Sequence, residues 1–513
     1  MMMQQILSNG FIKYLQKTND FLLFLFISLV SAILFSYPAL INLPPQTLHL
    51  WRQSDCLAFA LNYYDGQEFF QPRVYNYLND NGLCAGECPL IYYIVGKIWK
   101  ATGVQYWIFK SIQLLIFYGG AWALFKISLG ITQSRFSSFF IICCYFSAPL
   151  VMVYAPSYLA DIPSLSFGWM GLWSFYNYQK RKGLLPLSFT FICFLLAMLL
   201  KANAMFLPVS LVLIMITSKL KWVKENDILK YDTKLIIAIG ASIFIQYRWY
   251  AWVIEYTISH HSSFLGTGSW PGWPIWEASA LDIQNTNKML AYYAQDLFSI
   301  IGLFMSLIAL IFVCIHFFKR DAFAWLIIAY LGAVLCFLLY FFVGFKDNNY
   351  YFVNLYILPF LSLIFLIKKT QTYFVISHFK FILLAIVLLN FVYAYQRMHV
   401  YFNDGNQHQK LSEVYYHEGF RNFIDKNLSL NAQVISFPDA TPNGTLSIIQ
   451  RHGVSQYGFK EGKINEEDMQ MMLDRKINYY LCNKENGLSD TALTVHLDSI
   501  VGKFETLSLY KLK

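Results

Sequence analysis

Trp51-Arg52-Gln53-Ser54-Asp55 and Gly86-Glu87-Cys88-Pro89-Leu90-Ile91-Tyr92-Tyr93 are the two stretches around which this chain is organised. They open and close a polar segment that follows the first long apolar run, residues 21–43. That run is long enough to cross the roughly 30 Å of hydrocarbon in a bilayer, and no small-residue cleavage site follows it. We therefore expect it to stay as a membrane anchor, with the polar segment emerging directly after it.

The composition predicts a polytopic membrane protein. Of the 513 residues, 57% are hydrophobic, 19% aromatic and only 13% charged, whereas a soluble domain carries about 25% charged residues. The net charge of +9 does not indicate nucleic acid as a partner, because the basic residues of the membrane part sit mainly in the short gaps between apolar runs. That placement is the usual topology signal of a membrane protein. The expected surroundings are therefore a lipid bilayer.

The apolar runs predict about eleven membrane-spanning helices. Their expected positions are 21–43, 106–129, 136–154, 160–178, 185–200, 203–218, 235–254, 297–318, 322–344, 350–367 and 379–395. The run 89–101 is shorter than the ~17–25 residues that a span needs, and counting it as a span would break the pattern of charged loops. We predict a juxtamembrane helix there.

Basic residues predict the orientation of these spans, since loops rich in Lys and Arg face the cytoplasm. Every alternate loop is basic, namely 13–17, 126–135, 180–182, 219–234, 319–320 and 368–369. The N-terminus is therefore expected in the cytoplasm. The segments expected on the outer side are 44–105, 155–160, the junction at Lys201, 255–296, 345–349 and the tail from 396.

The outward loop 255–296 is rich in tryptophan. It contains Trp270-Pro271 and Trp273-Pro274, followed by Trp276. Anchoring at the membrane interface is one explanation for such residues. The alternative is a binding surface for a lipid-linked ligand.

The composition becomes polar from Gln396, which predicts a small α/β domain at 396–513 on the outer side. Strands are expected at Val434–Pro438, Tyr479–Cys482 and Glu505–Tyr510, and helices at 411–426 and 445–451. Nothing in the sequence distinguishes Asp439, Asn443 and His452 from ordinary surface residues. The fold class is therefore an all-α polytopic membrane protein, residues 1–395, with this domain appended. We expect the domain to recognise a substrate or cover a site rather than to supply catalytic groups.

Several charged residues stand at predicted span ends, where a functional role is the default hypothesis. An Asp or Lys at a helix centre costs about 2.5–3.5 kcal/mol on insertion scales. The predicted topology gathers these residues on one side: Asp55, Glu87, Asp161, Lys201, Arg248 and the group Asn349-Tyr350-Tyr351. Each one alone could be an ordinary interfacial charge, but their shared side favours a site. Carboxylates there could accept a proton, and cations could hold a phosphate.

These motifs, in this order, resemble the C-type (GT-C) integral membrane glycosyltransferases. The order is Trp-Arg-Gln-Ser-Asp, Gly-Glu-Cys-Pro-Leu-Ile-Tyr-Tyr, an Asp opening a later span, Leu-Leu-Lys-Ala-Asn and Asn-Tyr-Tyr. The similarity covers about residues 10–395. It is greatest to the bacterial branch of protein O-mannosyltransferases and the lipid A aminoarabinose transferase.

The resemblance implies transfer of a sugar from a polyprenyl-phosphate carrier to an acceptor on the outer face of the inner membrane, with inversion at the sugar carbon. The acceptor would be a protein, a lipid or a glycan. Carried onto this chain, Asp55 would be the base, with Asp161 and Glu87 as the further catalytic carboxylates. The donor phosphate would be bound by Lys201, Arg248 and Arg52, and the substrates by Trp51, Asn349, Tyr350 and Tyr351.

Two positions depart from the family pattern. Some members carry an acidic pair or Asp-x-Asp near the first motif, whereas Arg52-Gln53-Ser54 precedes Asp55 here. Together with the lack of a Cys/His cluster at ligand spacing, this predicts that no metal or other cofactor is required. A His often precedes the Tyr-Tyr pair in relatives, and Asn349 in its place would act by hydrogen bonding.

Three cysteines share the polar segment, Cys56, Cys84 and Cys88. In an oxidising compartment, a disulfide among them could fix Glu87 near Asp55. Free thiols are the alternative.

Two other functions compete with glycosyl transfer. A transporter or flippase for a lipid-linked or anionic substrate would also gather charges inside a bundle. However, its charges would lie near mid-membrane and its chain would show repeat symmetry, neither of which the sequence indicates. A membrane scaffold with a partner-binding domain would not explain the clustered Asp, Glu and Lys residues.

Overall fold

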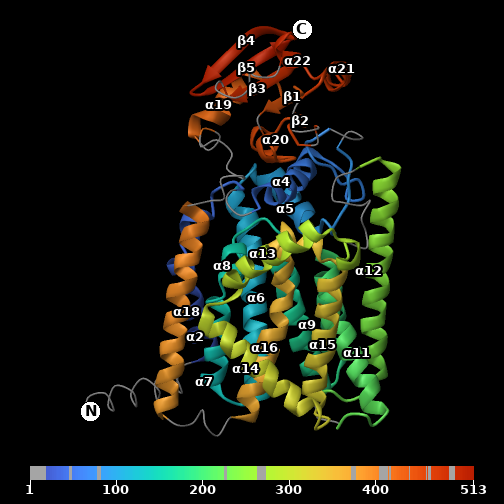
Figure 1. Ribbon diagram of the computed structural model, residues 1–513, viewed down its shortest axis with the longest axis vertical. Helices are drawn as coiled ribbons and strands as arrows, with labels where there is room; N and C mark the ends of the chain where they lie inside the picture. Colours follow the sequence, from blue (N-terminus) through green and yellow to red (C-terminus); the bar gives the residue numbers. More distant parts are fainter. Residues whose placement is uncertain are drawn as a thin grey trace, which may run out of the picture.

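The computed structural model shows a bundle of long helices with a small domain on one end (Figure 1). It describes residues 19–45, 49–77, 82–224, 228–262, 273–370, 377–403, 414, 417–437, 439–457, 459, 464–483 and 491–513. The small domain lies at one end of the long axis of the molecule (Figure 1). We call its described residues, 417 to 513, the C-terminal domain.

Within the described residues, six helical segments are long and apolar enough to cross a membrane. They are α6 (Tyr106–Thr132), η1 (Ala202–Met205) with α11 (Phe206–Lys219), α14 (Ile300–Phe317), α15 (Ala322–Tyr340), η5 (Asn349–Tyr356) with α16 (Ile357–Lys369), and a window within α18 (Ser377–Asn403). Shorter apolar helices are α2 (Asp20–Leu34), α7 (Arg135–Phe146) and α10 (Leu184–Leu200). The protein is thus a multi-pass membrane protein, while the expected count of about eleven spans is not confirmed.

Two further long helices belong to the bundle, α9 (Asp161–Arg181) and α12 (Thr233–Ser259). Helix α9 packs between α6 and α10, and α12 packs on α10 (Figure 1). Both fall at predicted spans, but they carry more polar residues than the six. The buried faces of α9 and α12 pack on α10, and this packing fixes the polar residues at the end of the bundle.

Two predicted spans are interrupted rather than continuous. The span expected at 136–154 consists of α7 and α8 (Pro149–Tyr154), with Ala148 in an extended conformation between them. Pro149 explains the break, because it lacks an N–H and disfavours helical backbone in the preceding residue. The span expected at 21–43 is interrupted at Ser36, whose φ of 57° is left-handed, before the short α3 (Tyr37–Leu40).

Helix α18 ends at Asn403, beyond the expected end of the last span at 395. An ion pair holds these last turns to the bundle, since Arg397 binds Asp296 of α13 (Ala280–Leu297), with Nε 3.1 Å from Oδ1. The polar composition that suggested an exit from the bundle therefore belongs to the last helical turns.

The predicted basic loops 180–182, 319–320 and 368–369 lie at the end of the bundle remote from the C-terminal domain (Figure 1), whereas the loop 13–17 lies outside the described residues. Lys182 pairs with Asp232 at 2.8 Å, and Lys369 pairs with Asp321 at 2.7 Å. The backbone of Lys224 donates to Arg320 at 2.8 Å. The alternation of basic and non-basic loops therefore corresponds to two ends of one bundle.

The C-terminal domain is built on a five-stranded sheet of order β2-β1-β3-β5-β4. Strand β1 (Val434–Phe437) runs parallel to β2 (Gly453–Ser455) and to β3 (Tyr479–Asn483). Strand β5 (Leu507–Leu512) is antiparallel to β3 and to β4 (Leu497–Phe504). The helices are α19 (Glu418–Asn427), α20 (Gly444–Ile449), α21 (Glu466–Asp474) and α22 (Thr491–Thr494).

The predicted strands and helices of this domain are found close to their expected positions. Strands β2 and β4 and helices α21 and α22 were not predicted. Part of the helix expected at 411–426 lies outside the described residues, and α19 begins at Glu418.

The domain is docked onto the polar segment that links α4 (Leu50–Asp65) to α5 (Leu90–Thr102). Tyr77 donates its backbone N–H to Gly453 at 2.6 Å, and Gly453 donates to Tyr75 at 3.0 Å. Asn76 thereby forms a parallel bridge with Gly453 beside β2. Helix α20 lies on α4 (Figure 1), which brings the domain directly over the first motif.

Candidate active site

Five charged side chains form an alternating row at the end of the bundle beneath the C-terminal domain. The row runs Asp55, Arg52, Glu87, Lys201, Asp161. Arg52 lies 3.6 Å from Asp55 and 2.5 Å from Glu87, and Lys201 lies 3.9 Å from Glu87 and 3.1 Å from Asp161. We call these residues the charged row. Segments far apart in the sequence therefore bring three carboxylates and two cations together.

The first two members come from one helical face. Arg52 and Asp55 are three residues apart on α4, so their side chains point the same way. The helix begins after His49, at a φ of 52°, and ends at Gly66, at a φ of 115°. Because Gly has no Cβ, it adopts the left-handed conformation that stops the helix at little cost.

Glu87 stands in the short loop before α5, and neighbours fix that loop on two sides. The backbone N–H of Cys88 donates to Leu199 of α10 at 2.9 Å. Trp249 of α12 donates its indole N–H to the Gly86 carbonyl at 3.1 Å. The second quoted motif is thereby held against the bundle, with the Glu87 carboxylate between Arg52 and Lys201.

The last two members stand at helix ends. Asp161 is the first residue of α9, and Lys201 follows the last residue of α10, where the chain changes to η1. A carboxylate at a helix N-terminus and a cation at a C-terminus both complement the helix dipole. A buried amide pair supports the junction, because Asn354 donates to Asn203 at 2.9 Å and accepts from Ser164 at 3.2 Å.

Burial differs along the charged row. Asp55 is fully buried, and the Glu87 and Lys201 side chains keep 11% of their surface exposed. Burial raises the pKa of Asp55 to about 7, although Arg52 lowers it. Burial also raises the pKa of Glu87, but Arg52 and Lys201 outweigh this effect and hold that pKa below its usual range. Glu87 is thus a fixed anion, whereas Asp55 can gain and lose a proton near neutral pH.

The predicted Asn-Tyr-Tyr group lies beside the row. The Lys201 ammonium is 5.1 Å from the centre of the Tyr350 ring, and the Tyr351 ring lies 4.7 Å from that of Tyr350. Asn349 accepts a hydrogen bond from Tyr154 at 2.5 Å and contacts His49 Nε2 at 2.9 Å. Aromatic faces and amides thereby form the wall of the site next to Lys201.

Trp51 is half-buried beside this wall, with its ring edge-on to His49 at 6.5 Å. His49 itself was missed by the sequence analysis. The Asn-Tyr-Tyr motif at the start of η5 lacks a histidine, yet this ring, just before α4, contacts Asn349 across 300 residues of sequence. Burial lowers the pKa of His49 to about 4, so its imidazole is neutral at physiological pH.

The structure does not bring Arg248 to the charged row. The face of α12 that packs on the bundle carries Ser242, Gln246, Val253 and Thr257, all buried. Arg248 follows Gln246 by two residues, so at about 100° per residue it points to the opposite side. It is exposed. Trp249 contacts the loop of Gly86 and Glu87 instead. The prediction therefore chose the right turn of α12 but the wrong face of the helix.

Asn443 of the C-terminal domain reaches the row, contrary to the expectation that this domain supplies no group to the site. Its amide Nδ2 donates to Asp55 Oδ1 at 2.8 Å, and the residue is fully buried. Asp439, at 3% exposure, is also no ordinary surface residue. No local signal in the sequence indicates this, because the contact depends on the docking of a separate domain.

The disulfide that was hypothesised for the polar segment is absent. Cys56, Cys84 and Cys88 are free thiols and all three are buried. The Tyr92 hydroxyl lies 3.1 Å from Cys56 Sγ. Ion pairs, rather than a covalent bridge, hold Glu87 next to Arg52 and Asp55.

Part of the tryptophan-rich loop, Trp270 and Pro271 included, lies outside the described residues. Trp273 packs on Phe341 at 5.6 Å and Trp276 on Tyr340 at 4.7 Å. Both contacts are at the end of α15, which leaves the anchoring and ligand-binding interpretations open.

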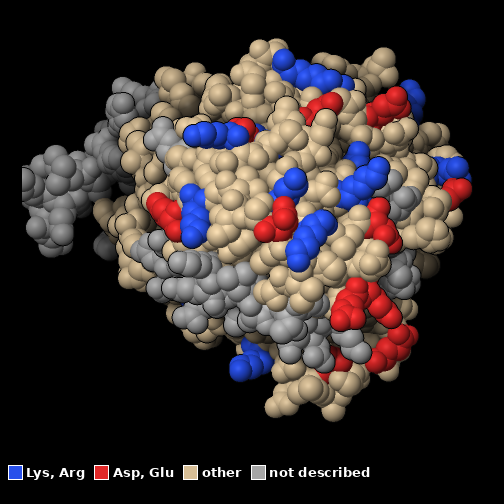
Figure 2. Space-filling model, turned by 90° about the horizontal axis from the view of Figure 1, so that it is seen from above, with Lys and Arg blue, Asp and Glu red and all other residues tan. Residues whose placement is uncertain are grey.

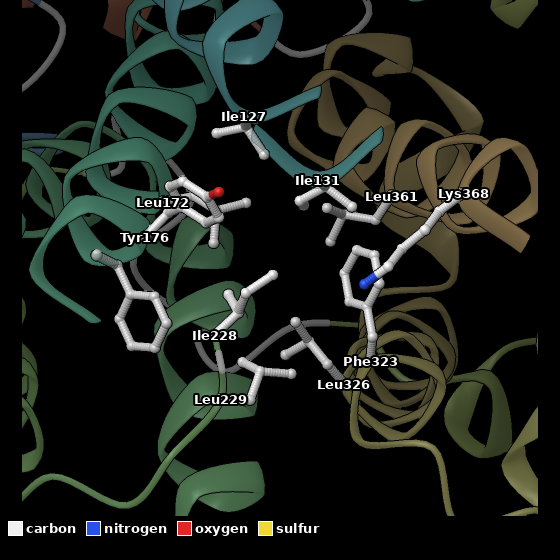
Figure 3. A pocket seen from close by; sticks show the side chains of 11 residues that line it. Ile127, Ile131, Leu172, Tyr176, Ile228, Leu229, Phe323, Leu326, Leu361 and Lys368 are labelled. Carbon is white, nitrogen blue, oxygen red and sulfur yellow. The ribbon is translucent and has the colours of Figure 1, made fainter. Parts of the chain in front are cut away.

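A pocket elsewhere in the bundle offers fewer chemical groups than the charged row. An apolar pocket is lined by residues such as Ile131, Leu172 and Leu326 (Figure 3). Its lining offers one charged side chain, Lys368, and none of the predicted site residues.

The face that carries the C-terminal domain shows acidic and basic side chains close together (Figure 2). In the described chain no three Asp, Glu, His or Cys residues are grouped to hold a metal ion.

The Arg52–Glu87 pair is expected to stabilise the fold as well as the site. Arg52→Ala leaves Asp55 without its cation and Glu87 with Lys201 alone, which should lower the free energy of unfolding by about 3–5 kcal/mol. The matched control is Arg135→Ala, which removes the more exposed pair with Asp20 at 2.8 Å and should cost at most about 1 kcal/mol. Thermal unfolding in detergent measures both, and equal losses would contradict this account.

Comparisons with known proteins agree on the fold. No protein-family model and no curated protein matches the sequence. Among solved structures, ArnT from Cupriavidus metallidurans bound to undecaprenyl phosphate matches 96% of this chain and 97% of its own, with 11% identity and a TM-score of 0.58. The Archaeoglobus fulgidus oligosaccharyltransferase in complex with Zn and sulfate matches 90% of this chain and 68% of its own, with 11% identity and a TM-score of 0.55.

A third similar structure is the archaeal oligosaccharyltransferase AglB from the same organism, in complex with an inhibitory peptide and a dolichol-phosphate. It matches 90% of this chain and 69% of its own, with 10% identity and a TM-score of 0.53. At these identities the likeness establishes the fold. The expected fold of the C-type membrane glycosyltransferases is therefore confirmed.

Proposed function

We propose that this protein is an inverting glycosyltransferase that moves a sugar from a polyprenyl-phosphate carrier to an acceptor on the outer face of the inner membrane. The observation that carries the proposal is the arrangement of Asp55 and Lys201. A titratable carboxylate and a partly exposed ammonium belong to one network and are held apart by Arg52 and Glu87, which lie between them. General-base chemistry and leaving-group stabilisation need these two groups, held apart.

Asp55 would act as the base. Its Oδ1 is held by Asn443, while Oδ2 accepts no hydrogen bond from the described residues and faces Arg52 at 3.6 Å. Oδ2 would take the proton from the acceptor's hydroxyl or amine. The freed electron pair would form the bond to the anomeric carbon, and the bond from that carbon to the phosphate oxygen would break. A single displacement of this kind inverts the configuration.

Lys201 would bind the phosphate that leaves. Its ammonium contacts Asp161 and Glu87 and keeps some exposure, so a third N–H remains to donate to a phosphate oxygen. Negative charge on that phosphate grows as the sugar departs, and a fixed cation stabilises the growing charge. Arg52, engaged by two carboxylates, would support Lys201 through Glu87. Arg248 would reach the phosphate only if α12 rotated about its own axis.

The donor class rests on chemistry and on the similar structures. ArnT is bound to undecaprenyl phosphate in one of them, and AglB to dolichol-phosphate in another. A polyprenyl-phosphate donor fits a phosphate-binding cation at the end of a membrane bundle. We propose a protein, lipid or glycan as the acceptor and no required metal, since each carboxylate of the row is already paired with a cation.

Access to the base requires displacement of the groups that cover it. Asp55 is fully buried beneath α20 and its neighbours, whereas Glu87 and Lys201 are the partly exposed members of the row. We therefore place donor entry at Lys201 and acceptor entry at the boundary of the C-terminal domain.

The pH dependence of sugar transfer tests the proposed base. Because Asp55 has a pKa of about 7 and must be ionised to accept a proton, kcat/KM should fall about tenfold per pH unit below that value. A phosphodiester donor stays ionised over this range and does not produce such a fall. The measurement is transfer of label from polyprenyl-phosphate sugars in purified membranes. A profile flat from about pH 8 to pH 5 would contradict a base of raised pKa.

A further inference from the structure

Asn443 joins the C-terminal domain to the charged row with both ends of its side chain. Nδ2 donates to Asp55 Oδ1 at 2.8 Å. Oδ1 accepts from the backbone N–H groups of Tyr75 and Asn76, each at 3.1 Å. The oxygen of this buried amide therefore accepts two hydrogen bonds, and one N–H of its nitrogen donates to a carboxylate. Two fixed acceptor contacts leave the amide one orientation, with nitrogen toward Asp55.

The loop that presents Asn443 is itself held rigidly. Asp439 accepts from the Thr441 backbone at 2.8 Å and from the Thr445 backbone at 2.9 Å. Ser455 donates to the Thr441 carbonyl at 2.7 Å. Asn443 directly precedes α20, so the turn and the helix fix its backbone on both sides. A side chain held this firmly can impose an orientation on its partner.

We propose that Asn443 is a positioning residue, which fixes one oxygen of Asp55 so that the other is presented to the acceptor in ionised form. This inference rests on the proposed function and deepens it, because the C-terminal domain then completes the active site. The physical reason is that an amide N–H stabilises the carboxylate more than the protonated acid, and it leaves Oδ2 as the oxygen available to the acceptor.

The other titratable groups around Asp55 keep one charge state near pH 7, so the effect of Asn443 on the pKa of Asp55 can be measured by itself. Arg52 and Cys56 face Asp55 from α4, Glu87 and Cys84 from the polar segment, and Tyr457 from the C-terminal domain. Burial raises the pKa of the Cys56 thiol to about 12 and raises the pKa values of Cys84 and Tyr457. These three groups are neutral near pH 7. Glu87 stays charged, so loss of the Asn443 donor should raise the pKa of Asp55.

Asn443→Asp tests this with little change of shape. The new carboxylate still accepts from the Tyr75 and Asn76 backbones, so docking of the domain is kept, but it cannot donate to Asp55. Two carboxylates in contact share a proton. The acid limb of kcat/KM should therefore move up by about one pH unit or more, with activity regained at higher pH and little change in KM for the donor.

Asn427→Asp is the matched control. It adds the same charge to the same domain, where the Asn427 side chain donates to the Phe423 carbonyl of its own helix at 2.8 Å. Its acid limb should coincide with that of the wild type. An Asn443→Asp limb that also coincides with the wild type would overturn the proposal. So would a variant faster than wild type, since the contact would then restrain the base. Wild-type membranes without transfer would instead remove the proposed function.

A second measurement needs no catalysis and applies even if Asn443→Asp folds poorly. Melting temperatures of Asp55→Ala, Asn443→Ala and the double variant form a double-mutant cycle. The proposal expects non-additive shifts, with the double variant more stable than the sum of the single losses. Additive shifts would overturn the contact on which the proposal depends.

Discussion

Asp55→Asn is expected to lower kcat for sugar transfer by about 10²–10⁴-fold. An amide cannot take the proton of the acceptor, so the displacement loses its base. The fold should persist, because an Asn carbonyl oxygen still accepts from Asn443, and Arg52 keeps its pair with Glu87. The measurement compares label transferred per folded protein in membranes of the variant and the wild type.

Asp65→Asn is the matched control on the same helix. Asp65 ends α4 and contacts the Tyr75 hydroxyl at 3.3 Å, away from the charged row. This variant should transfer label close to the wild-type rate. If Asp55→Asn were equally active, Asp55 would be excluded as the base, and Glu87 or Asp161 would have to take that role.

Lys201→Ala is expected to lower kcat by about 10²–10³-fold, the usual loss when one preorganised stabilising group is removed. The leaving phosphate loses its cation, and Asp161 and Glu87 lose the charge between them. Lys201→Arg keeps the charge with a different shape and should retain part of the activity. Turnover at saturating donor separates this loss from weaker donor binding.

Arg248→Ala provides the contrast for Lys201. Its side chain is exposed on the outer face of α12, so the substitution should leave turnover near that of the wild type. A loss as large as that of Lys201→Ala would contradict the placement of α12 and restore Arg248 to the phosphate site, as the resemblance had implied.

The sequence alone predicted that the members of the charged row lie at one end of the bundle, because the distribution of basic residues among the loops indicates which loops share a side. Loops of one polarity alternate along a membrane chain, so Asp55, Glu87, Asp161 and Lys201 had to lie at one end. Their order within the row was not predictable. It follows from the i, i+3 spacing on α4 and from the contacts of Gly86 and Cys88 with α12 and α10.

Helix phase and domain docking explain what the sequence analysis missed. Arg248 lies close in sequence to the buried Gln246, and only the packing of α12 shows that it faces away. Asn443 contacts Asp55 across 388 residues of sequence. That contact depends on docking of the C-terminal domain at residues 75–77, for which no periodicity or composition gives a signal.

The central claim is tested most directly by sugar transfer in a defined system. Purified protein in liposomes is supplied with undecaprenyl phosphate carrying one of several labelled sugars, together with membranes as the source of acceptor. The account predicts that label reaches an acceptor with inverted configuration, that undecaprenyl phosphate is released in equal amount, and that Asp55→Asn does neither. Movement of intact lipid-linked sugar across the bilayer, without transfer from any carrier, would contradict the account and identify a transporter.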